Sequence, residues 1–402
     1  MNKRILVFCD FYLPGFKSGG GMWTVANLVD RFQDKYDFYI VTRNYDSRDD
    51  MVPYTSVNTG VWNTVGNATV FYAEEKSLNQ VHFARLVNGI KPDVVFLNSV
   101  FSTPAVQFLR ARMRKIGQNI PVIIAPCGEM SKAALSLKPL KKKLFLRYAS
   151  IAGMYRDVIW KASARSEVEE IKNAVGQKAE TWIAPDLPPR TIIPDYSPSL
   201  KPEKQSGSVR FAFVSRLVRK KNLHFFLELL KSIRLGNVYL DIIGPLEDTA
   251  YWRECLSIID TLPDNVKINV TGPMRYDDAL KTLCKAHFFV LPTLNENFGY
   301  VFIEALSAGC PLLISDRTMW KHVGRHNAGW TLPLEKADLW LEKIACCIKM
   351  DSAKYQQMSA AARNYALTWL GNPEIEEATE RVLNRAINGK TNPSDNEHYS
   401  TG

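Results

Sequence analysis

The sequence lacks the short motifs through which many enzymes bind a metal ion. No Asp-x-Asp triplet and no Cys-x-x-Cys pair occurs among the 402 residues. His322 and His326 are four residues apart, but no acidic residue lies between them, so the zinc pattern His-Glu-x-x-His is absent. We therefore expect no metal requirement and no cofactor, and we interpret both histidines as ordinary surface or core residues.

Long apolar runs are also absent. No run approaches the roughly 20 residues that a membrane-spanning helix needs. The apolar stretch that begins at Ile5 is too short for a secretory signal and lacks a small-residue cleavage site, so we interpret it as a first buried strand. The 7 cysteines are odd in number and several fall inside apolar patterns, which is typical of reduced, buried thiols. These features predict a cytoplasmic protein.

The charge balance is strongly positive, with a formal net charge of +10. An excess of positive charge favours an anionic partner, which can be nucleic acid, a phosphorylated substrate or an acidic lipid surface. The chain does not interleave basic and aromatic residues as nucleic-acid-binding surfaces do, so we expect no nucleic-acid partner.

Short apolar strands alternate with segments of helical period along the chain. In the first half we expect strands at Ile5–Cys9, Phe38–Thr42, Val94–Leu97, Val122–Ala125 and Glu180–Ala184, and helices at Met22–Phe32 and over about 140–175. In the second half the expected strands are Val209–Val214, Tyr239–Ile243, Val266–Val270, His287–Leu291 and Leu312–Ser315. Helices are expected between them and, at the end of the chain, at Leu339–Met350, Ala353–Trp369 and Ile375–Ile387. This alternation predicts an α/β fold with parallel sheets covered on both faces.

A proline-rich stretch that starts at Pro185 divides the two halves and is the best domain boundary in the chain. We predict an N-terminal Rossmann-like domain over residues 1–187, a linker over 188–207 and a second Rossmann-like domain over 208–370. The two doubly wound domains are expected to face a cleft. Residues 371–388 are expected to form a helix that packs back on the N-terminal domain, and residues 389–402 a disordered tail.

The first candidate site is the glycine run Gly19, Gly20 and Gly21, which follows the first strand. Glycines let a phosphate approach backbone N–H groups closely. The run is neither G-x-G-x-x-G nor a Walker loop, and the second strand ends at Arg43 and Asn44 without the acidic residue that a dinucleotide ribose usually requires. This argues against NAD and leaves a phosphate-binding loop or a purely structural one.

The second candidate site lies after the strand Val209–Val214, where Arg216 and Lys221 are five residues apart. A forked guanidinium and a compact ammonium together suit a diphosphate, and they can neutralise the charge that grows on a leaving nucleotide diphosphate. The alternative is a solvated basic turn, which is how we interpret Arg219 and Lys220.

The third candidate site runs from Glu296 to Glu304 and is the most informative segment of the chain. It has the pattern of a polar loop and a helix start after a strand, where open α/β sheets bind ligands. Free N–H groups there favour anions, and carboxylates can accept hydrogen bonds from hydroxyls. A hydrolase acid/base pair and a simple helix N-terminal charge are the alternatives. The segment predicts a ligand that is both phosphorylated and rich in hydroxyls, which is a nucleotide sugar.

Two further segments follow the strand Val122–Ala125. Cys127 and Glu129 lie in the loop after it; a buried thiol is commoner than a nucleophile without a nearby histidine, so Glu129 is the better functional candidate. The next helix mixes basic and apolar residues, which suits either an anionic membrane surface or a solvated helix face. Its basic residues are Lys138, Lys141, Lys142, Lys143 and Arg147.

Together these motifs resemble glycosyltransferase family 4, whose members are retaining enzymes of the GT-B fold. The segment from Leu291 to Pro311 matches the family motif E-x-F-G-x-x-x-x-E and the A-x-G-x-P that follows it. Arg216 to Lys221 matches its R-x-x-x-x-K, and Ser18-Gly19-Gly20 its N-terminal glycine loop. The loop at Cys127 and the Lys-rich helix resemble transferases of bacterial surface polysaccharides, of the O-antigen and capsule type.

The resemblance implies that the first domain is the acceptor-side domain and that the second is the nucleotide-sugar-binding domain. It also implies a role for each matching residue. Arg216 and Lys221 would hold the donor diphosphate, Glu304 the ribose hydroxyls, and Glu296 the hydroxyls of the transferred sugar. The implied catalytic residues are Glu296, Arg216 and Lys221. The full implied donor set is Gly19, Gly20, Gly21, Arg216, Lys221, Glu296, Asn297, Phe298, Gly299 and Glu304, with Cys127 and Glu129 on the acceptor side.

Two departures from the family pattern concern the first domain. Family members commonly have His or Arg where Cys127 stands, and the usual Pro-Asn-Gly at the end of the first domain is here Pro185-Asp186-Leu187. The first affects sugar contacts and the second the hinge between the domains.

The resulting hypothesis is a metal-independent retaining hexosyltransferase that moves a sugar from UDP-sugar, or second from GDP-sugar, to a saccharide or lipid-linked glycan. The expected location is the cytoplasm, either free or peripheral on the inner face of the cytoplasmic membrane. The acceptor would attack on the leaving group's own face and lose its proton to the departing phosphate. Two other hypotheses are a GT-B-like sugar-nucleotide epimerase and a non-enzymatic basic protein that binds a membrane or nucleic acid.

Overall fold

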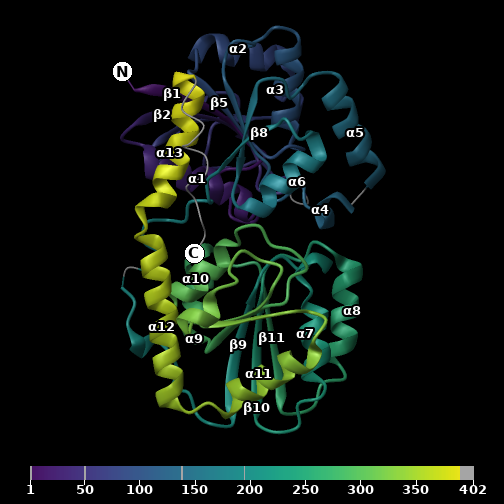
Figure 1. Cartoon of the computed structure of the whole chain (residues 1–402), viewed down its shortest axis with the longest axis vertical. Helices are drawn as coiled ribbons and strands as arrows, with labels where there is room; N and C mark the ends of the chain where they lie inside the picture. The colour runs from purple at the N-terminus through teal and green to yellow at the C-terminus, as the bar shows by residue number, and fades with distance from the viewer. Residues whose placement is uncertain (1, 49–50, 137–138, 194, 390–402) are drawn as a thin grey trace. The chain divides into compact units, whose positions relative to one another are not determined.

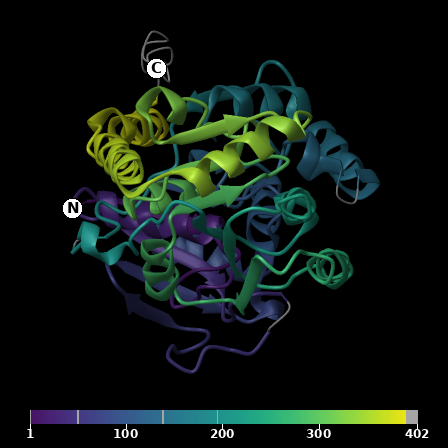
Figure 2. The ribbon, with the colours of Figure 1, turned by 90° about the horizontal axis from the view of Figure 1, so that it is seen from below.

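The computed structural model describes residues 2–48, 51–136, 139–193 and 195–389. The chain forms two compact units, one made of Met1–Pro189 with Asn372–Gly402 and the other of Arg190–Gly371. In each unit a single layer of strands carries helices on both sides (Figures 1 and 2). None of the helices in the described ranges has the length and apolar character needed to span a bilayer.

The first unit contains an eight-stranded sheet with the order β3-β4-β2-β1-β5-β6-β7-β8. All neighbouring strands are parallel except β3 and β4, which are antiparallel. The strands are β1 Lys3–Phe8, β2 Tyr36–Arg43, β3 Trp62–Val65, β4 Ala68–Ala73, β5 Val94–Asn98, β6 Val122–Ala125, β7 Val158–Ala162 and β8 Glu180–Ile183. Because β5, β6 and β7 are buried along their whole length, the sheet forms the centre of this unit.

Helices cover both faces of this sheet. One face packs a large apolar core against α2 Gln80–Ile90, α3 Thr103–Met113, α5 Pro139–Ile151 and α6 Arg165–Val175. The short helix α4 Lys132–Ser136 precedes α5, and α1 Gly20–Phe32 packs against β5. The last helix, α13 Pro373–Asn388, contacts β5 and β7, so the C-terminal end of the chain completes the first unit (Figure 1).

The second unit contains a six-stranded, fully parallel sheet with the order β11-β10-β9-β12-β13-β14. Its strands are β9 Ser208–Val214, β10 Asn237–Ile243, β11 Val266–Gly272, β12 Phe288–Leu291, β13 Leu312–Ser315 and β14 Gly329–Leu332. Its helices are α7 Leu223–Leu230, α8 Thr249–Ile259, α9 Tyr276–Lys285, α10 Tyr300–Ser307, α11 Ala337–Lys349 and α12 Ser352–Leu370. The prediction of two Rossmann-like α/β sheets with helices at the end of the chain is confirmed.

One sequence-based expectation in the first unit is wrong. Residues 140–175 are not one helical region, because β7 lies between α5 and α6. The strand is only five residues long and contains Lys161, which conceals its burial in the sequence pattern. In the fold, the Lys161 Nζ pairs with the Asp186 Oδ1 at 2.9 Å, so the charge is compensated inside the unit.

From Arg190 onward, the expected linker belongs to the second unit. The Lys201 Nζ donates to the carbonyls of Leu283 and Ala286, at the end of α9, over 2.9 and 2.7 Å. The Lys204 Nζ donates to the carbonyls of Ile348 and Met350, at the end of α11. Both ammonium groups thus satisfy carbonyls that helix ends leave without partners, and they hold the segment against the unit. The expected disordered tail lies outside the described residues apart from Gly389.

Candidate functional site

The candidate donor residues of the second unit come from the carboxyl ends of two neighbouring strands. β9 leads to Arg216 and to the 3₁₀ turn Arg219–Lys221, and β12 leads to the loop that contains Glu296. Strands β9 and β12 pair in parallel, so both segments leave the sheet at the same edge. This pairing brings residues together that are 75 positions apart in the sequence.

Lys221 and Glu296 form an ion pair, from the Lys221 Nζ to the Glu296 Oε2. Both side chains are largely buried, with 11% and 14% of their surface exposed. Burial by itself favours the neutral carboxyl, but the positive charges of Lys221, Lys220 and Arg216 outweigh it and lower the pKa of Glu296. Glu296 is therefore an ionised hydrogen-bond acceptor at neutral pH.

Arg216 lies at the same edge but is more exposed. Its Nη1 is 3.0 Å from the Oε2 of Glu247, and 45% of the Arg216 side chain is exposed. The turn is positioned by the next strand end, where the Leu217 N–H donates to the Pro245 carbonyl over 2.9 Å. Gly244 is required there because its φ is 143° and a Cβ would lie 1.9 Å from the Ser215 carbonyl oxygen. The sequence identified Arg216 but not Glu247 as its partner.

The loop that carries Glu296 is held by hydrogen bonds on several sides. The Leu294 N–H donates to the Lys220 carbonyl, and the Glu296 N–H to the Arg317 carbonyl, each over 2.9 Å. The Trp320 indole N–H donates to the Phe298 carbonyl over 2.7 Å and is fully buried. These hydrogen bonds therefore connect the loop to the basic turn. Trp320 was not identified from the sequence.

Gly299 is the residue before α10 and has a φ of 71°. A Cβ at this position would lie 2.6 Å from the Phe302 ring and 2.8 Å from the Glu296 Cγ, so a side chain has neither the backbone conformation nor the space it needs. The Phe298 ring packs with Tyr300, Trp320 and Trp369. Gly299 and Phe298 thus hold the helix start, where N–H groups favour a bound anion.

Glu304 lies about one turn into α10 and is partly buried. Burial raises its pKa to about 8. The same carboxyl contributes to raising the pKa of the Tyr276 hydroxyl, after burial itself, which places Tyr276 within electrostatic range. Glu304 is therefore neutral at pH 7 in this unliganded structure, in contrast to Glu296.

In the first unit the glycine run forms the start of α1. Gly19 precedes the helix with a φ of 72°, and Gly20 and Gly21 are its first two residues, so the helix begins two residues before the expected Met22. A Cβ on Gly19 would meet nothing within 4 Å. The need for glycine at this position is therefore conformational and not steric.

Asn98, at the end of β5, connects the glycine run to Cys127. Its Nδ2 donates to the Gly21 carbonyl over 2.8 Å, and its Oδ1 is 3.3 Å from the Cys127 Sγ. The three residues follow the adjacent strands β1, β5 and β6. Ser99 and Cys127 have positive φ values of 88° and 53°, which is unusual for residues other than glycine and typical of functional edges. Sequence reasoning missed Asn98, although a polar residue at the end of an apolar strand was a usable signal.

Cys127 and Glu129 are both constrained by their surroundings. Burial, with Asp186 and Glu167 nearby, raises the pKa of the Cys127 thiol well above its usual range, which argues against a nucleophile. The Glu129 carboxylate accepts from the Ser99 hydroxyl over 2.8 Å and from the Val100 N–H over 2.7 Å. Glu129 therefore holds the loop after β5. Glu167, which accepts from the Gly128 N–H over 2.6 Å, holds the Cys127 loop in the same way and was not predicted.

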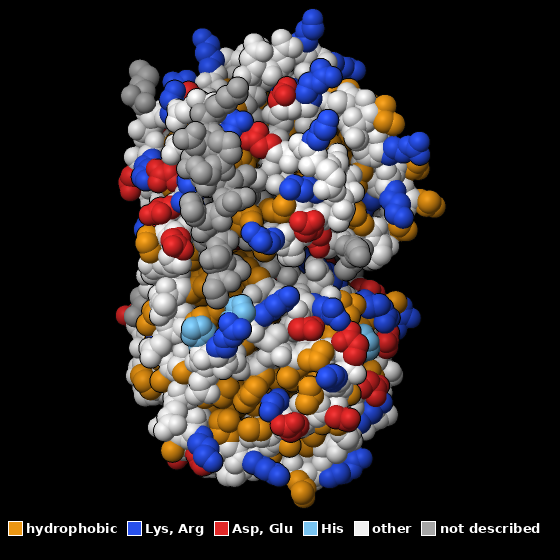
Figure 3. Space-filling view, viewed as in Figure 1, with side chains coloured by type: hydrophobic (Ala, Val, Ile, Leu, Met, Phe, Trp, Pro, Cys, Tyr) orange, Lys and Arg blue, Asp and Glu red, His pale blue; other side chains and the backbone are white. Residues whose placement is uncertain are grey.

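The basic helix α5 presents an apolar stripe to solvent. Four side chains are exposed to 78%, 67%, 53% and 78% respectively: Leu140, Leu144, Tyr148 and Ile151. At about 100° per residue, Lys141 lies on one side of this stripe and Lys143 and Arg147 on the other. Figure 3 shows hydrophobic and basic side chains next to one another over α5. Lys142 lies on the opposite side of the helix and donates to the Ala134 carbonyl over 2.7 Å. Lys138 lies outside the described residues.

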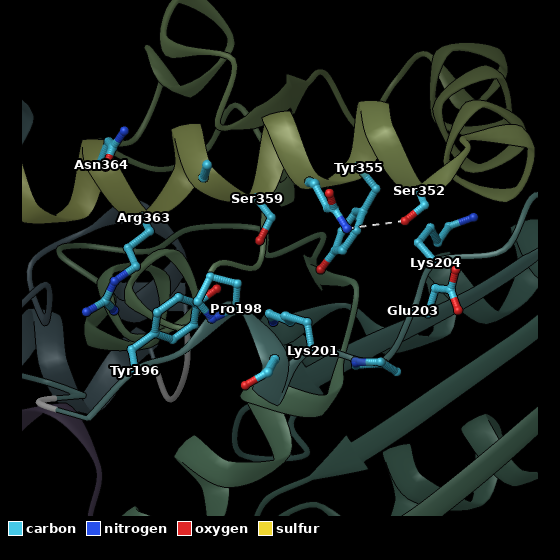
Figure 4. Close-up of a pocket in the computed structure, with 14 residues that line it drawn as sticks. Tyr196, Pro198, Lys201, Glu203, Lys204, Ser352, Tyr355, Ser359, Arg363 and Asn364 are labelled. Atoms are coloured by element: carbon cyan, nitrogen blue, oxygen red, sulfur yellow. Dashed lines mark hydrogen bonds between the residues drawn. The ribbon is translucent and has the colours of Figure 1, made fainter.

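A cavity of about 750 Å³ lies elsewhere in the second unit, between α12 and the segment that precedes β9. Figure 4 shows Tyr355, Ser359 and Arg363 projecting from α12 toward Tyr196 and Lys201. The residues that line it include none of the candidate donor residues. In the described part of the chain, no group of three or more His, Cys, Asp or Glu side chains is close enough together to hold a metal ion.

Comparisons with known proteins agree with this geometry. Residues 199–365 match the family model described as "Glycosyl transferases group 1". This match covers β9 to α12 and includes every candidate donor residue of the second unit. No curated protein is similar enough to the chain to count as a match.

Several solved structures share the fold over almost the whole chain. Sucrose-phosphate synthase (tll1590) from Thermosynechococcus elongatus is 15% identical with a TM-score of 0.71, and the match covers 97% of this chain and 100% of that one. Anabaena Alr3699/HepE in complex with UDP and glucose is 17% identical with a TM-score of 0.67, over 95% of this chain and 99% of that one. WaaG, a glycosyltransferase involved in lipopolysaccharide biosynthesis, is 13% identical with a TM-score of 0.64, over 96% and 100%.

These similarities establish the fold, which is that of the GT-B glycosyltransferases. Within the second unit, residues 199–365 match the glycosyl transferases group 1 model.

Proposed function

We propose that this protein is a retaining, metal-independent glycosyltransferase of family 4. It moves a sugar from a nucleotide sugar, UDP-sugar first and GDP-sugar second, to a saccharide or lipid-linked acceptor. The observation that carries the proposal is the Lys221–Glu296 pair at the edge where β9 and β12 end, in a domain of glycosyltransferase type. The neighbour solved with UDP and glucose and the lipopolysaccharide transferase WaaG support this donor class and a role in bacterial surface polysaccharide synthesis.

The chemistry follows from the charges at this edge. The donor diphosphate replaces Glu247 as the partner of Arg216, and the positive charge of Arg216 then acts together with that of Lys221. Two cations therefore stabilise the leaving group as the bond from the anomeric carbon to the phosphate oxygen breaks. Glu296 accepts hydrogen bonds from the sugar hydroxyls, and Glu304 from the ribose hydroxyls. The acceptor hydroxyl bonds to the anomeric carbon on the face that the phosphate leaves, and its proton passes to the departing phosphate. The proposed donor set also includes Gly19 to Gly21, Asn297, Phe298 and Gly299.

The test begins with a thermal-shift panel of nucleotide sugars, because a true donor stabilises the folded protein by mass action. Transfer is then measured for Lys221→Ala and Glu296→Gln with the donor that gives the largest shift. We expect both variants to lose at least about two orders of magnitude in kcat/KM, as when a catalytic charge contact is removed. Arg219→Ala is the matched control, because Arg219 lies in the same turn but pairs with Glu254. Normal turnover in the first two variants would refute the proposal.

The two other hypotheses make different predictions. An epimerase would convert the nucleotide sugar with no acceptor present, which a product assay of the same reaction reveals. A non-enzymatic basic protein would bind nucleic acid or vesicles with strong salt dependence and gain no stability from a nucleoside diphosphate. The glycosyltransferase domain of the second unit favours neither of them.

We also propose that α5 binds the surface of an anionic membrane from the cytoplasmic side, which would bring a lipid-linked acceptor to the enzyme. The exposed stripe of Leu140, Leu144 and Ile151 would enter the interface, and Lys141, Lys143 and Arg147 would contact acidic headgroups. Co-sedimentation with vesicles containing anionic lipid tests this: Leu144→Glu is expected to abolish binding. Leu235→Glu is the control, because Leu235 is 83% exposed but lies in the second unit. Equal loss of binding in both variants would refute a specific role for α5.

A further inference from the structure

One face of the second sheet carries polar side chains where a parallel sheet is normally apolar. Arg210 on β9 pairs in register with Tyr239 on β10, and Ala212 pairs with Asp241, which in turn pairs with Asn269 on β11. Paired residues of parallel strands point to the same face, so these side chains form one surface across three strands. On the edge strand β11, Lys267, Asn269 and Thr271 are exposed, so the face is open to solvent there.

A hydrogen-bond network organises this face. Asp241 is 3% exposed, and both its oxygens accept from the Arg210 Nη1, over 3.1 and 2.9 Å. The Asn269 Nδ2 donates to the Asp241 Oδ1 over 2.9 Å. The Arg210 guanidinium also lies 5.1 Å from the centre of the Tyr239 ring. Burying the Asp241 carboxylate costs free energy that an aliphatic side chain would not cost, and the hydrogen bonds from Arg210 and Asn269 compensate it. The same hydrogen bonds hold Arg210 and Asn269 in defined positions.

A cavity of about 550 Å³ lies over this network. Its floor is formed by Arg210, Asp241, Asn269 and Thr271, one wall by the segment from Ser199 to Pro202, and the other by α9. α9 contributes Thr282 and Lys285. The volume is within the range of small-molecule sites, about 300–1,000 Å³. The cavity is distinct from the candidate donor site, since it shares no residue with it.

The groups that face this cavity retain hydrogen-bonding capacity. Of the three guanidinium nitrogens of Arg210, only Nη1 is hydrogen-bonded within the described part of the chain, which leaves the Nε and Nη2 donors. Lys285 is exposed at the end of α9 and has no ion-pair partner in the described part of the chain. Since Arg210 and Asp241 compensate each other, Lys285 leaves the cavity positive. Amide and hydroxyl groups of Asn269 and Thr282 complete a surface that suits a hydroxyl-rich anion.

We propose that this cavity is a second binding site, for an acidic saccharide unit. Its carboxylate is bound by Lys285 and the free nitrogens of Arg210, and its hydroxyls by Asn269 and Thr282. A site of this kind would hold a glycan at a distance from the donor site. The proposal concerns binding alone and does not depend on the proposed transferase activity.

The test is calorimetric titration of the full-length protein with a trisaccharide that ends in a hexuronic acid. The same trisaccharide with a neutral hexose at that end is titrated in parallel, and no nucleotide sugar is present. We expect saturable binding of the acidic ligand and roughly tenfold weaker binding in Lys285→Ala, as for the loss of one charge-assisted hydrogen bond. Arg210→Met is expected to weaken binding further.

Lys267→Ala is the matched control, since Lys267 is an exposed lysine on the same face and does not line the cavity. Binding in this variant is expected to be unchanged. Absence of saturable binding, equal affinity for the neutral ligand, or an equal effect of Lys267→Ala would each overturn the proposal. Lys221→Ala is expected to bind the trisaccharide normally, because Lys221 does not line this cavity. If it does so while the wild-type protein shows no transfer with any donor, the proposed function is refuted but the proposed second site is not.

Discussion

Glu296 and Glu304, the two candidate carboxylates near the start of α10, have pKa values that are shifted in opposite directions. Glu296 has positive neighbours that lower its pKa, whereas burial without a nearby cation raises the pKa of Glu304 to about 8. The sequence identified both residues, because they lie in one segment that follows a strand and starts a helix. It did not reveal that the two differ in protonation, since that depends on neighbours more than 70 positions away.

The protonation of Glu304 leads to a testable prediction. Ribose hydroxyls that donate to Glu304 favour its ionised form, so donor binding is expected to release a proton below about pH 8 and to become tighter as the pH rises from about 6 to about 8. Calorimetry in buffers of different ionisation enthalpy measures this release. Glu304→Gln is expected to bind with no such release.

The same shift affects stability. The folded protein holds the Glu304 proton more tightly than the unfolded chain, so the free energy of unfolding is expected to fall as the pH rises from about 4.5 to about 8. Glu304→Gln should remove that part of the pH dependence.

For the calorimetric experiment, uptake of a proton on donor binding would contradict the assigned role of Glu304. An unchanged proton release in Glu304→Gln would contradict it as well.

At the scale of elements, the loop before α10 depends on residues that the motif does not contain. The Trp320 indole N–H satisfies the Phe298 carbonyl inside the unit, and the Ser315 hydroxyl donates to the Thr293 carbonyl over 2.6 Å. Ser315 is the last residue of β13, the strand next to β12, and Trp320 follows that strand. The motif thus identifies the candidate residues, whereas the neighbouring strand determines their geometry.

We therefore predict that Trp320→Phe impairs donor binding more than it impairs folding. The variant keeps an aromatic ring but leaves the Phe298 carbonyl without its donor, at a cost of about 1–3 kcal/mol. Trp340→Phe is a matched control: Trp340 is fully buried in the same unit, and its indole donates to the Pro333 carbonyl over 3.1 Å. The temperature of thermal unfolding is expected to fall in both variants, while the KM for the donor is expected to rise only in Trp320→Phe. A similar rise in both would mean that the effect is one of stability alone.

Elements that the sequence did not reveal share a physical cause. β7 is buried on both faces but includes Lys161, whose charge is compensated by Asp186 in another segment. β14 has four residues and begins with Gly329. Short or charged strands gain their stability from neighbours across the sheet, so their own residues carry little periodic signal.

At the scale of the whole molecule, the chain order does not match the order of the units. α13 follows the second unit in sequence but packs on the first, where Ile375, Val382 and Leu383 are buried. Ion pairs join it to the same unit: Arg31 with Glu376 at 3.3 Å, Lys35 with Glu380 at 2.8 Å and Arg385 with Glu180 at 2.8 Å. The last helix is thus a structural part of the N-terminal half.

Removal of α13 is therefore expected to destabilise the first unit selectively. Each of its large buried apolar side chains contributes about 1.5–3 kcal/mol, so their sum is comparable to the stability of a domain. In a chain that ends at Gly371, calorimetry should show a lowered or missing transition for the first unit and an unchanged one for the second. A chain that ends at Gly389 is the control and should melt like the full protein. Equal destabilisation of both units would contradict the assignment of α13.

Local pattern was sufficient for much of this protein. Alternating strands and helices predicted two α/β sheets, and the segments around Lys221 and Glu296 predicted a site for a phosphorylated, hydroxyl-rich ligand, because the relevant spacings lie within one loop or one helix turn. Tertiary structure alone decided which distant residues meet, such as Asn98 with Gly21 and Cys127, and Arg210 with Asp241 and Asn269. Those contacts depend on strand order and register, which arise from the packing of the whole sheet and leave no periodic trace in any single segment.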